Sequence, residues 1–193
     1  ESRHLGAAEA AARVAECHRR VDGRSFAVAV KKIDSTLRGN LVAETAAMLR
    51  ASGTSEVIVA PAFPAQGRTV RGGRVFVGDV PLEQTAFVRD ALSPALAIPL
   101  AQAFADAGIA VTVRDAQTDG ELDAVVAGLP RTGSMPLIVG SAGITSALAR
   151  AMARKDAPAR TPSVIGRIVF VIGSRAHASR EQVARLAADG ATV

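Results

Sequence analysis

Short apolar runs alternate along this chain with segments of helical composition, and this alternation limits the fold more than any other feature of the sequence. Runs rich in Val and Ile are typical of buried strands, and alanine-rich segments favour helices. The predicted strands are 26–31, 57–60, 109–113, 136–139 and 168–172, and the predicted helices are 6–20, 41–50, 95–107, 119–128, 144–155 and 180–188. Strands that alternate with helices form a mainly parallel sheet. The sequence therefore predicts a layered α/β fold with helices flanking that sheet.

One segment departs from the alternation. Residues 69–77 predict a β-hairpin, because Gly72 and Gly73 supply the positive φ angles of a tight turn between two apolar runs. We interpret the hairpin as an insertion into the α/β fold.

Size and cysteine content narrow the class of protein. The chain has 193 residues, of which 49% are hydrophobic, so a sizeable core is available. Its apolar runs are far shorter than the ~20 residues of a membrane helix, and no membrane association is predicted. The single cysteine, Cys17, excludes an intrachain disulfide and agrees with a cytoplasmic location. Since the chain begins with Glu1 and stops at Val193 in a strand-like run, we expect a fragment of a longer protein.

The charge pattern argues against nucleic acid as a partner. The net charge is +5, which can attract small polyanions as well as nucleic acid. The chain has neither Trp nor Tyr and only six Phe, so base-stacking platforms are poorly supplied. A small anionic molecule is the better candidate.

Polar side chains follow the strand predicted at 26–31. Asp34, Ser35 and Arg38 come where that strand ends and the helix 41–50 has not yet begun. Ligands of open α/β sheets bind at the carboxyl ends of strands. A well-capped turn would explain Asp34 and Ser35, but a turn needs no guanidinium, whereas a carboxylate or phosphate ligand does.

Two later turns are weaker candidates. Arg68 follows a stiff, proline-containing loop after the strand 57–60, and it is either a solvated arginine or an anion-binding one. Gly140 and Ser141 begin a glycine-bearing turn between a strand and a helix, where backbone N–H groups can face an anion. A tight turn that needs glycine explains the same residues.

Three motifs in this order resemble the four-carbon acid-sugar kinase family, long catalogued as a domain of unknown function. They are Lys32-Ile33-Asp34-Ser35-Thr36-Leu37-Arg38-Gly39-Asn40, Pro61-Ala62-Phe63-Pro64 with Gly67-Arg68-Thr69, and Gly140-Ser141-Ala142-Gly143. Gly173-Ser174 resembles the opening of the nucleotide-binding domain of that family. The resemblance covers nearly the whole chain.

The resemblance implies an ATP-dependent kinase, with Mg²⁺, that phosphorylates a hydroxyl of a threonate, an erythronate or a 3-oxo-tetronate. It implies a sugar-acid-binding domain at 1–157 that lacks its first strand, a linker at 158–166, and the start of a nucleotide-binding domain at 167–193. Asp34, Ser35, Arg38 and Arg68 would bind the sugar acid. Gly140, Ser141, Gly173 and Ser174 would bind the nucleotide. The general base would belong to a family segment with paired aspartates that is absent here.

Two other functions stay open at this point. One is a sensor that binds a sugar acid or a nucleotide without turnover, which an assay of ADP release with tetronates would separate from a kinase. The other is an NAD-binding domain, although the turn 140–143 lacks the third glycine of that fingerprint. Titration with ATP against NAD would decide, and a homodimer is left open.

Overall fold

The computed structural model describes residues 2–21, 26, 28–130, 134–153, 169, 171–172 and 177–191. The chain divides into two compact units, Glu1–Lys155 and Asp156–Val193, which are described separately below. The finer division into domains and a linker stays a prediction.

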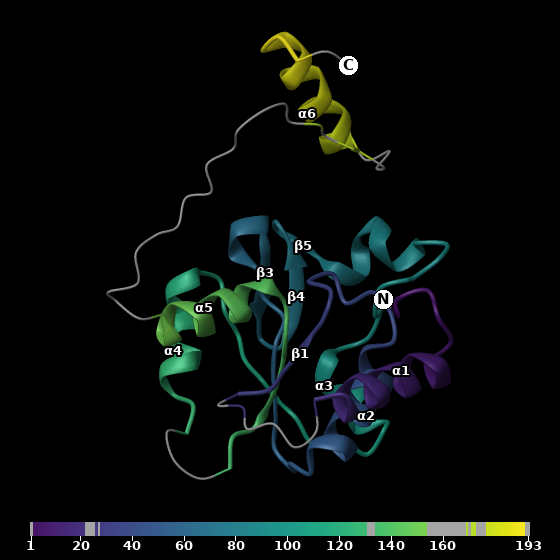
Figure 1. Ribbon diagram of the computed structural model, residues 1–193, viewed down its shortest axis with the longest axis vertical. Helices are drawn as coiled ribbons and strands as arrows, with labels where there is room; N and C mark the ends of the chain where they lie inside the picture. The colour runs from purple at the N-terminus through teal and green to yellow at the C-terminus, as the bar shows by residue number, and fades with distance from the viewer. Residues whose placement is uncertain are drawn as a thin grey trace. The chain divides into compact units, whose positions relative to one another are not determined.

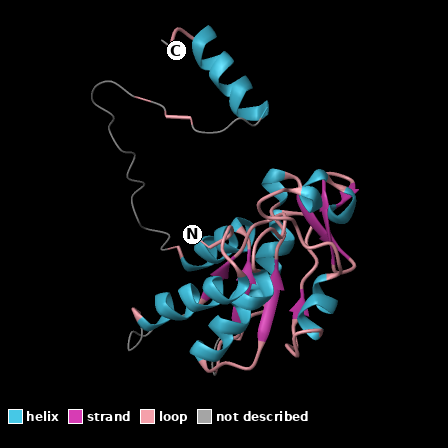
Figure 2. Ribbon diagram, turned by 90° about the vertical axis from the view of Figure 1, so that its right-hand side faces the viewer, coloured by secondary structure: helices cyan, strands magenta, loops and turns pink. Residues whose placement is uncertain are grey.

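The first unit is built on a parallel four-stranded sheet, which confirms the predicted fold class (Figure 2). Its strands are β1 (Val30–Lys32), β7 (Leu137–Gly140), β2 (Val57–Ala60) and β6 (Thr112–Val113), in that spatial order. The two central strands are buried along their whole length. Such strands are continuous apolar runs because both faces of the sheet are covered.

Helices cover the two faces of this sheet (Figure 1). On one side lie α1 (Ala7–Arg19), α2 (Leu41–Ser52) and α3 (Leu100–Ala105), and on the other side lie α4 (Asp119–Ala127) and α5 (Ala142–Met152). This division follows from right-handed crossovers. The chain moves from β1 through α2 to β2 and β6, then returns through α4 to β7, so the later helices lie on the opposite face.

A separate antiparallel sheet confirms the hairpin and extends it. It consists of β3 (Arg68–Arg71), β4 (Arg74–Val77) and the short β5 (Val80–Pro81). Three short 3₁₀ helices flank it, at Pro64–Gln66, Leu82–Gln84 and Ala86–Arg89. The hairpin turn is fixed to the main sheet by Asp115, whose carboxylate accepts from the N–H groups of Gly72 at 2.5 Å and Gly73 at 2.8 Å.

Some predicted boundaries are wrong. The first strand begins at Val30, and Phe26, expected inside it, is 59% exposed. The helix predicted at 95–107 is shortened to Leu100–Ala105, because Pro99 precedes its first turn and Ala95 instead makes a bridge to Arg38. The last two strands and helices of this unit lie within three residues of their predicted bounds. The largest shifts are the start of β6 at Thr112 instead of 109 and the end of α5 at Met152 instead of 155.

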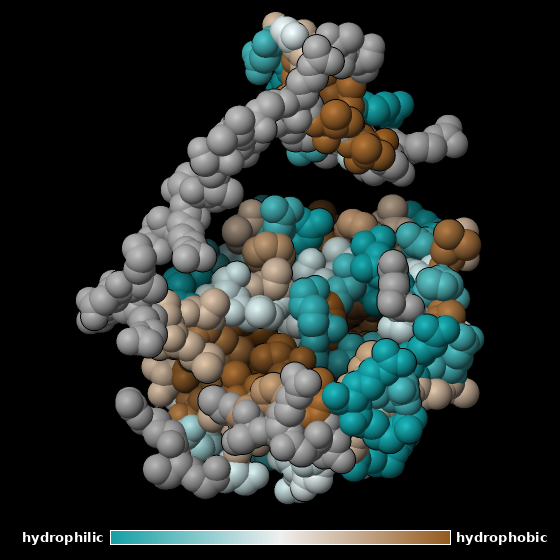
Figure 3. Space-filling view, in the orientation of Figure 1, coloured by the Kyte–Doolittle hydropathy of each residue, from teal (hydrophilic) through white to brown (hydrophobic). Residues whose placement is uncertain are grey.

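Outside the core, one face of the first unit carries an apolar hollow. Figure 3 shows hydrophobic side chains gathered beside α5, where the hollow is lined in part by Val28, Met135, Leu148 and Met152. This hollow lies at α4 and α5, and its charged lining residues, Asp123 and Arg150, form an ion pair with each other.

In the second unit, the structure describes one helix, α6 (His177–Ala188), which matches the helix predicted at 180–188. The predicted strand 168–172 lies largely outside the described residues. In the described part of the chain, every helix is too short or too polar to cross a membrane.

Candidate functional site

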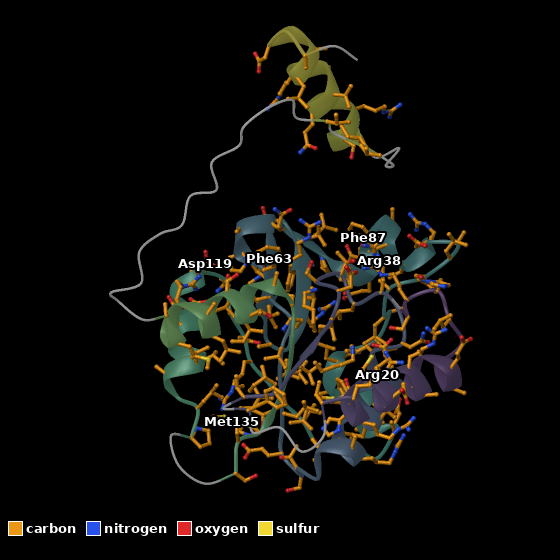
Figure 4. All side chains as sticks on the ribbon, viewed as in Figure 1. Arg20, Arg38, Phe63, Phe87, Asp119 and Met135 are labelled. Atoms are coloured by element: carbon orange, nitrogen blue, oxygen red, sulfur yellow. The ribbon has the colours of Figure 1, made fainter. Side chains whose placement is uncertain are left out.

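The carboxyl ends of the parallel strands meet at one end of the sheet, and the strongest sequence motif lies there. Figure 4 shows Arg38, which follows β1, and Phe63, which follows β2, at this end. Met135, which precedes β7, lies at the opposite end in the same view. The site is therefore where parallel α/β sheets bind ligands.

Asp34 is the centre of this site. Its carboxylate accepts a hydrogen bond from Nε of Arg38 at 3.0 Å and one from the hydroxyl of Thr36 at 2.5 Å. Nη2 of Arg3 lies 3.3 Å from the other carboxylate oxygen. Two guanidinium groups and a hydroxyl thus converge on one carboxylate.

These contacts hold the pKa of Asp34 low. Burial raises the pKa of this carboxyl, but the hydrogen bonds from Arg38 and Thr36, with the charges of Arg38 and Arg3, outweigh burial and lower the pKa to about 2. A group with such a pKa stays ionised at neutral pH and is a poor proton carrier. Asp34 is suited to accept hydrogen bonds from hydroxyl groups, not to act as a general base.

Arg38 is held from three sides. Besides Asp34, it has the carboxylate of Asp90 3.6 Å from Nη1, and its guanidinium lies over the ring of Phe87, 5.2 Å from the centroid. Figure 4 shows Arg38 and Phe87 side by side. Nη2 has no partner among the described residues, so this edge of the guanidinium is available to a ligand.

Leu37 gives the turn its shape. Its φ angle is +53°, in the left-handed region that β-carbon sterics disfavour. Two backbone hydrogen bonds hold it there: its N–H donates to the carbonyl of Asp34 at 3.0 Å, and its carbonyl accepts from Leu96 at 3.1 Å. Its side chain is only 4% exposed. The core therefore anchors the residue that precedes Arg38.

A second ion pair lies beside the first. Nζ of Lys31 is 2.6 Å from the carboxylate of Glu44, which also accepts from the hydroxyl of Ser2 at 2.5 Å. The amide of Asn40 donates to the carbonyls of Ser2 and Leu5. Residues 2–5 are thus fastened over the turn. Together these side chains line a polar hollow with Arg3, Lys32, Asp34 and Arg38.

The other residues predicted to bind the sugar acid are less tightly placed. Ser35 lies in the same turn, half-buried, and its hydroxyl makes no hydrogen bond to a described residue. Arg68 begins β3 and pairs through its backbone with Phe63, so it lies at the same end of the sheet but does not line the hollow around Asp34. Its Nη1 donates to the carbonyl of Gln66, and its buried Nε has no partner among the described residues.

The predicted nucleotide residues of the first unit have structural roles. Ser141 is fully buried, and its hydroxyl donates to the carbonyl of Ala62 at 2.7 Å and accepts from the N–H of Gly143 at 3.2 Å, which caps α5. A Cβ on Gly140 would lie 2.2 Å from a side-chain carbon of Ile144. Close packing explains both residues, and a nucleotide contact by either stays a prediction. Gly173 and Ser174 lie outside the described residues.

The sequence interpretation missed two charged members of the site. Arg3 and Asp90 were not predicted to be near Asp34 and Arg38, and they come from 31 residues before and 52 residues after their partners. No spacing rule connects positions so far apart. Asp is a common turn residue, and Oδ1 of Asp90 accepts from the N–H groups of Leu92 and Ser93.

Comparison with known proteins gives consistent matches. A family model described as "Sugar-binding N-terminal domain" matches residues 1–105. A D-threonate kinase of Cupriavidus necator is 36% identical over 96% of this chain and 51% of its own length. A D-erythronate kinase of Heliobacterium modesticaldum is 33% identical over 95% of this chain and 48% of its own length.

A solved structure agrees with the sequence matches. It is a domain of unknown function from Bordetella bronchiseptica, a domain-swapped dimer with bound citrate. It is 31% identical, with a TM-score of 0.72, and covers 99% of this chain and 51% of its own. The chain thus spans about half the length of these relatives.

Proposed function

Because this chain belongs to the family of sugar-binding N-terminal domains, we propose that it is part of an ATP-dependent kinase that phosphorylates a hydroxyl of a four-carbon sugar acid. The relatives named as kinases of D-threonate, D-erythronate and 3-oxo-tetronate support this substrate class. The observation that carries the proposal is the arrangement of Arg38, Arg3 and Asp34 in a polar hollow at the carboxyl end of the sheet.

The chemistry of a sugar acid fits this arrangement. The free edge of the Arg38 guanidinium can donate to the carboxylate of the ligand. The ionised Asp34 and the hydroxyl of Ser35 can accept from and donate to the hydroxyls along its carbon chain. The citrate bound by the relative of known structure is also a small carboxylate. Arg68, at the same end of the sheet, would hold the transferred phosphoryl group or the carboxylate.

Phosphoryl transfer requires mainly positioning and charge stabilisation. ATP would supply the phosphoryl group, and Mg²⁺ would enter with it, because Mg²⁺ in such sites is held by one or two carboxylates together with the substrate phosphates. Gly173 and Ser174 remain our candidates for contacts with the nucleotide. The low pKa of Asp34 supports placing the role of general base on another residue.

Substitution of Arg38 tests the proposal in the full-length protein. ADP release is measured with D-threonate, D-erythronate and 3-oxo-tetronate. A charge-assisted hydrogen bond to a buried ionised partner contributes about 1.5–3 kcal/mol, so Arg38→Ala should lower kcat/KM by at least about tenfold. Circular dichroism should show that the fold is retained.

Arg20→Ala is the matched control, because Arg20 is exposed at the end of α1 and pairs only with Glu16 among the described residues. Its kcat/KM should stay within about twofold of wild type. Wild-type kinetics for Arg38→Ala would remove Arg38 from the site. Binding of a sugar acid without ADP release by the wild type would instead indicate a sensor.

A further inference from the structure

The polar hollow carries an excess of positive charge. Four basic and two acidic side chains line it, so the lining has a net charge of +2. Lys31 and Glu44 neutralise each other at 2.6 Å. The excess therefore resides on Arg3, Lys32 and Arg38, against the single carboxylate of Asp34.

Asp90 does not line the hollow but adds a negative charge to it. Its Oδ2 lies 3.6 Å from Nη1 of Arg38, beyond hydrogen-bond distance but close enough for the two charges to attract each other. Its Oδ1 has a different task, since it accepts from the N–H groups of Leu92 at 3.0 Å and Ser93 at 2.9 Å. One oxygen thus shapes the loop while the other faces the guanidinium.

The loop that carries Asp90 is itself fixed against the site. The hydroxyl of Ser93 donates to the carbonyl of Arg3 at 3.1 Å, and Ala95 makes a backbone bridge to Arg38. The charge of Asp90 is therefore held at a set distance from both arginines and does not move with a free surface loop.

We propose that Asp90 determines the charge selectivity of the site. By reducing the net charge of the cluster from +2 to +1, it favours a sugar acid with one carboxylate over a dicarboxylate of the same length. The inference rests on the proposed function and goes beyond it, since it concerns which anions the site rejects. Removing the charge of Asp90 should strengthen the binding of a dianion more than that of a monoanion, because Asp90 repels each negative charge of the ligand.

The expected size follows from Coulomb's law. Two unit charges about 8 Å apart, in a medium of effective dielectric constant of about 60, change a binding constant roughly threefold. Each negative charge on the ligand gains about that factor when Asp90 is neutralised. A dicarboxylate carries one more negative charge than a monocarboxylate, so neutralising Asp90 should strengthen its binding by one further factor of about three.

The experiment compares two ligands in the full-length protein without ATP. D-Threonate carries one carboxylate, and tartrate of the same configuration carries a second one in place of the terminal hydroxymethyl group. Calorimetry gives the Kd of each for wild type, Asp90→Asn and Asp123→Asn. Asp123 is the matched control, because it is also an aspartate paired with an arginine, 2.7 Å from Arg150, but it lines the hollow beside α5.

We expect the ratio of the tartrate Kd to the threonate Kd to fall about threefold in Asp90→Asn and to stay unchanged in Asp123→Asn. Asparagine keeps an oxygen that can accept from Leu92 and Ser93, so the loop should be retained. If Asp90→Asn does not fold, Asp90→Ser replaces it, since a serine hydroxyl can accept the same bonds. A fall of less than twofold in the folded variant overturns the inference.

The same preparation separates this inference from the kinase proposal. If threonate binds but is not phosphorylated when ATP is added, the kinase proposal fails and the selectivity of Asp90 is still measured. If threonate is phosphorylated and the Kd ratio is unchanged in Asp90→Asn, the kinase stands and this inference fails. If neither anion binds to the wild type and no ADP is released when ATP is added, both are wrong.

Discussion

The ionised carboxylate of Asp34 contributes to the stability of the fold as well as to the site. Asp34 has an ordinary pKa of 3.8 when unfolded and a pKa of about 2 in the fold, because the donors around it favour its ionised form over the burial that opposes it. A depressed pKa stabilises the fold above the unfolded value, and this stabilisation is lost as the pH falls toward the folded value. The shift corresponds to about 2 kcal/mol.

Asp34→Asn tests this coupling in the 193-residue chain. At pH 7 the variant should unfold with a free energy about 2 kcal/mol lower than wild type, and the difference should shrink as the pH falls from about 4 to about 2. Urea unfolding followed by circular dichroism at several pH values measures it. Asp79→Asn, at an exposed turn, should stay within about 0.5 kcal/mol of wild type. A difference that is constant from pH 7 to pH 2 would contradict the assignment.

At the scale of an element, the beginning of α5 is set by how closely two backbones approach. Gly143 lies in the first turn of the helix against the proline-containing loop after β2. A Cβ at this position would be 2.3 Å from the carbonyl oxygen of Ala62 and 2.8 Å from a side-chain carbon of Leu122. The glycine is therefore required by packing, independently of any ligand.

Gly143→Ala should lower the free energy of unfolding by about 2–4 kcal/mol, because the backbone of Ala62 cannot give way as a flexible side chain would. Gly120→Ala is the matched control in α4, where the nearest atom to a new Cβ is 3.9 Å away. It should stabilise the protein by up to about 1 kcal/mol. Denaturant unfolding measures both. A tolerated Gly143→Ala would show that packing does not require this glycine.

Sequence patterns predict some elements of this fold correctly and fail to predict others. Apolar runs and glycines predicted the central strands, the hairpin and most helices, because these depend on neighbouring residues. Thr118 and Asp119 are both residue types that commonly cap helices, and in the structure it is Thr118 that caps α4 by accepting from the N–H of Glu121. Adjacent polar residues compete for that position, and local sequence does not rank them. The spatial order of strands, and the approach of Arg3 and Asp90 to the site, depend on tertiary contacts that no periodicity encodes.

Across the whole first unit, two sheets are joined by few polar contacts. Val70 and Ala116 exchange backbone hydrogen bonds of 2.9 and 3.1 Å, and the carboxylate of Asp115 holds Gly72 and Gly73 at the turn. The first residue of this hairpin is Arg68. The attachment of the small sheet therefore influences where that arginine lies.

Asp115→Ala should loosen the hairpin without unfolding the protein. Amide hydrogen exchange at Gly72 and Gly73 should become at least tenfold faster, since both donors lose their acceptor, whereas amides of β2 and β7 should keep their protection. Asp115→Asn keeps one oxygen acceptor, so its exchange rates at Gly72 and Gly73 should lie between those of wild type and Asp115→Ala. Exchange that rises equally in both sheets would show instead that Asp115 supports global stability.

The left-handed backbone of Leu37 has a consequence for the redesign of this site. Glycine would relax that backbone but would empty a place in the core, whereas any β-branched residue would increase the strain. A search for variants with altered ligand binding should therefore leave Leu37 unchanged.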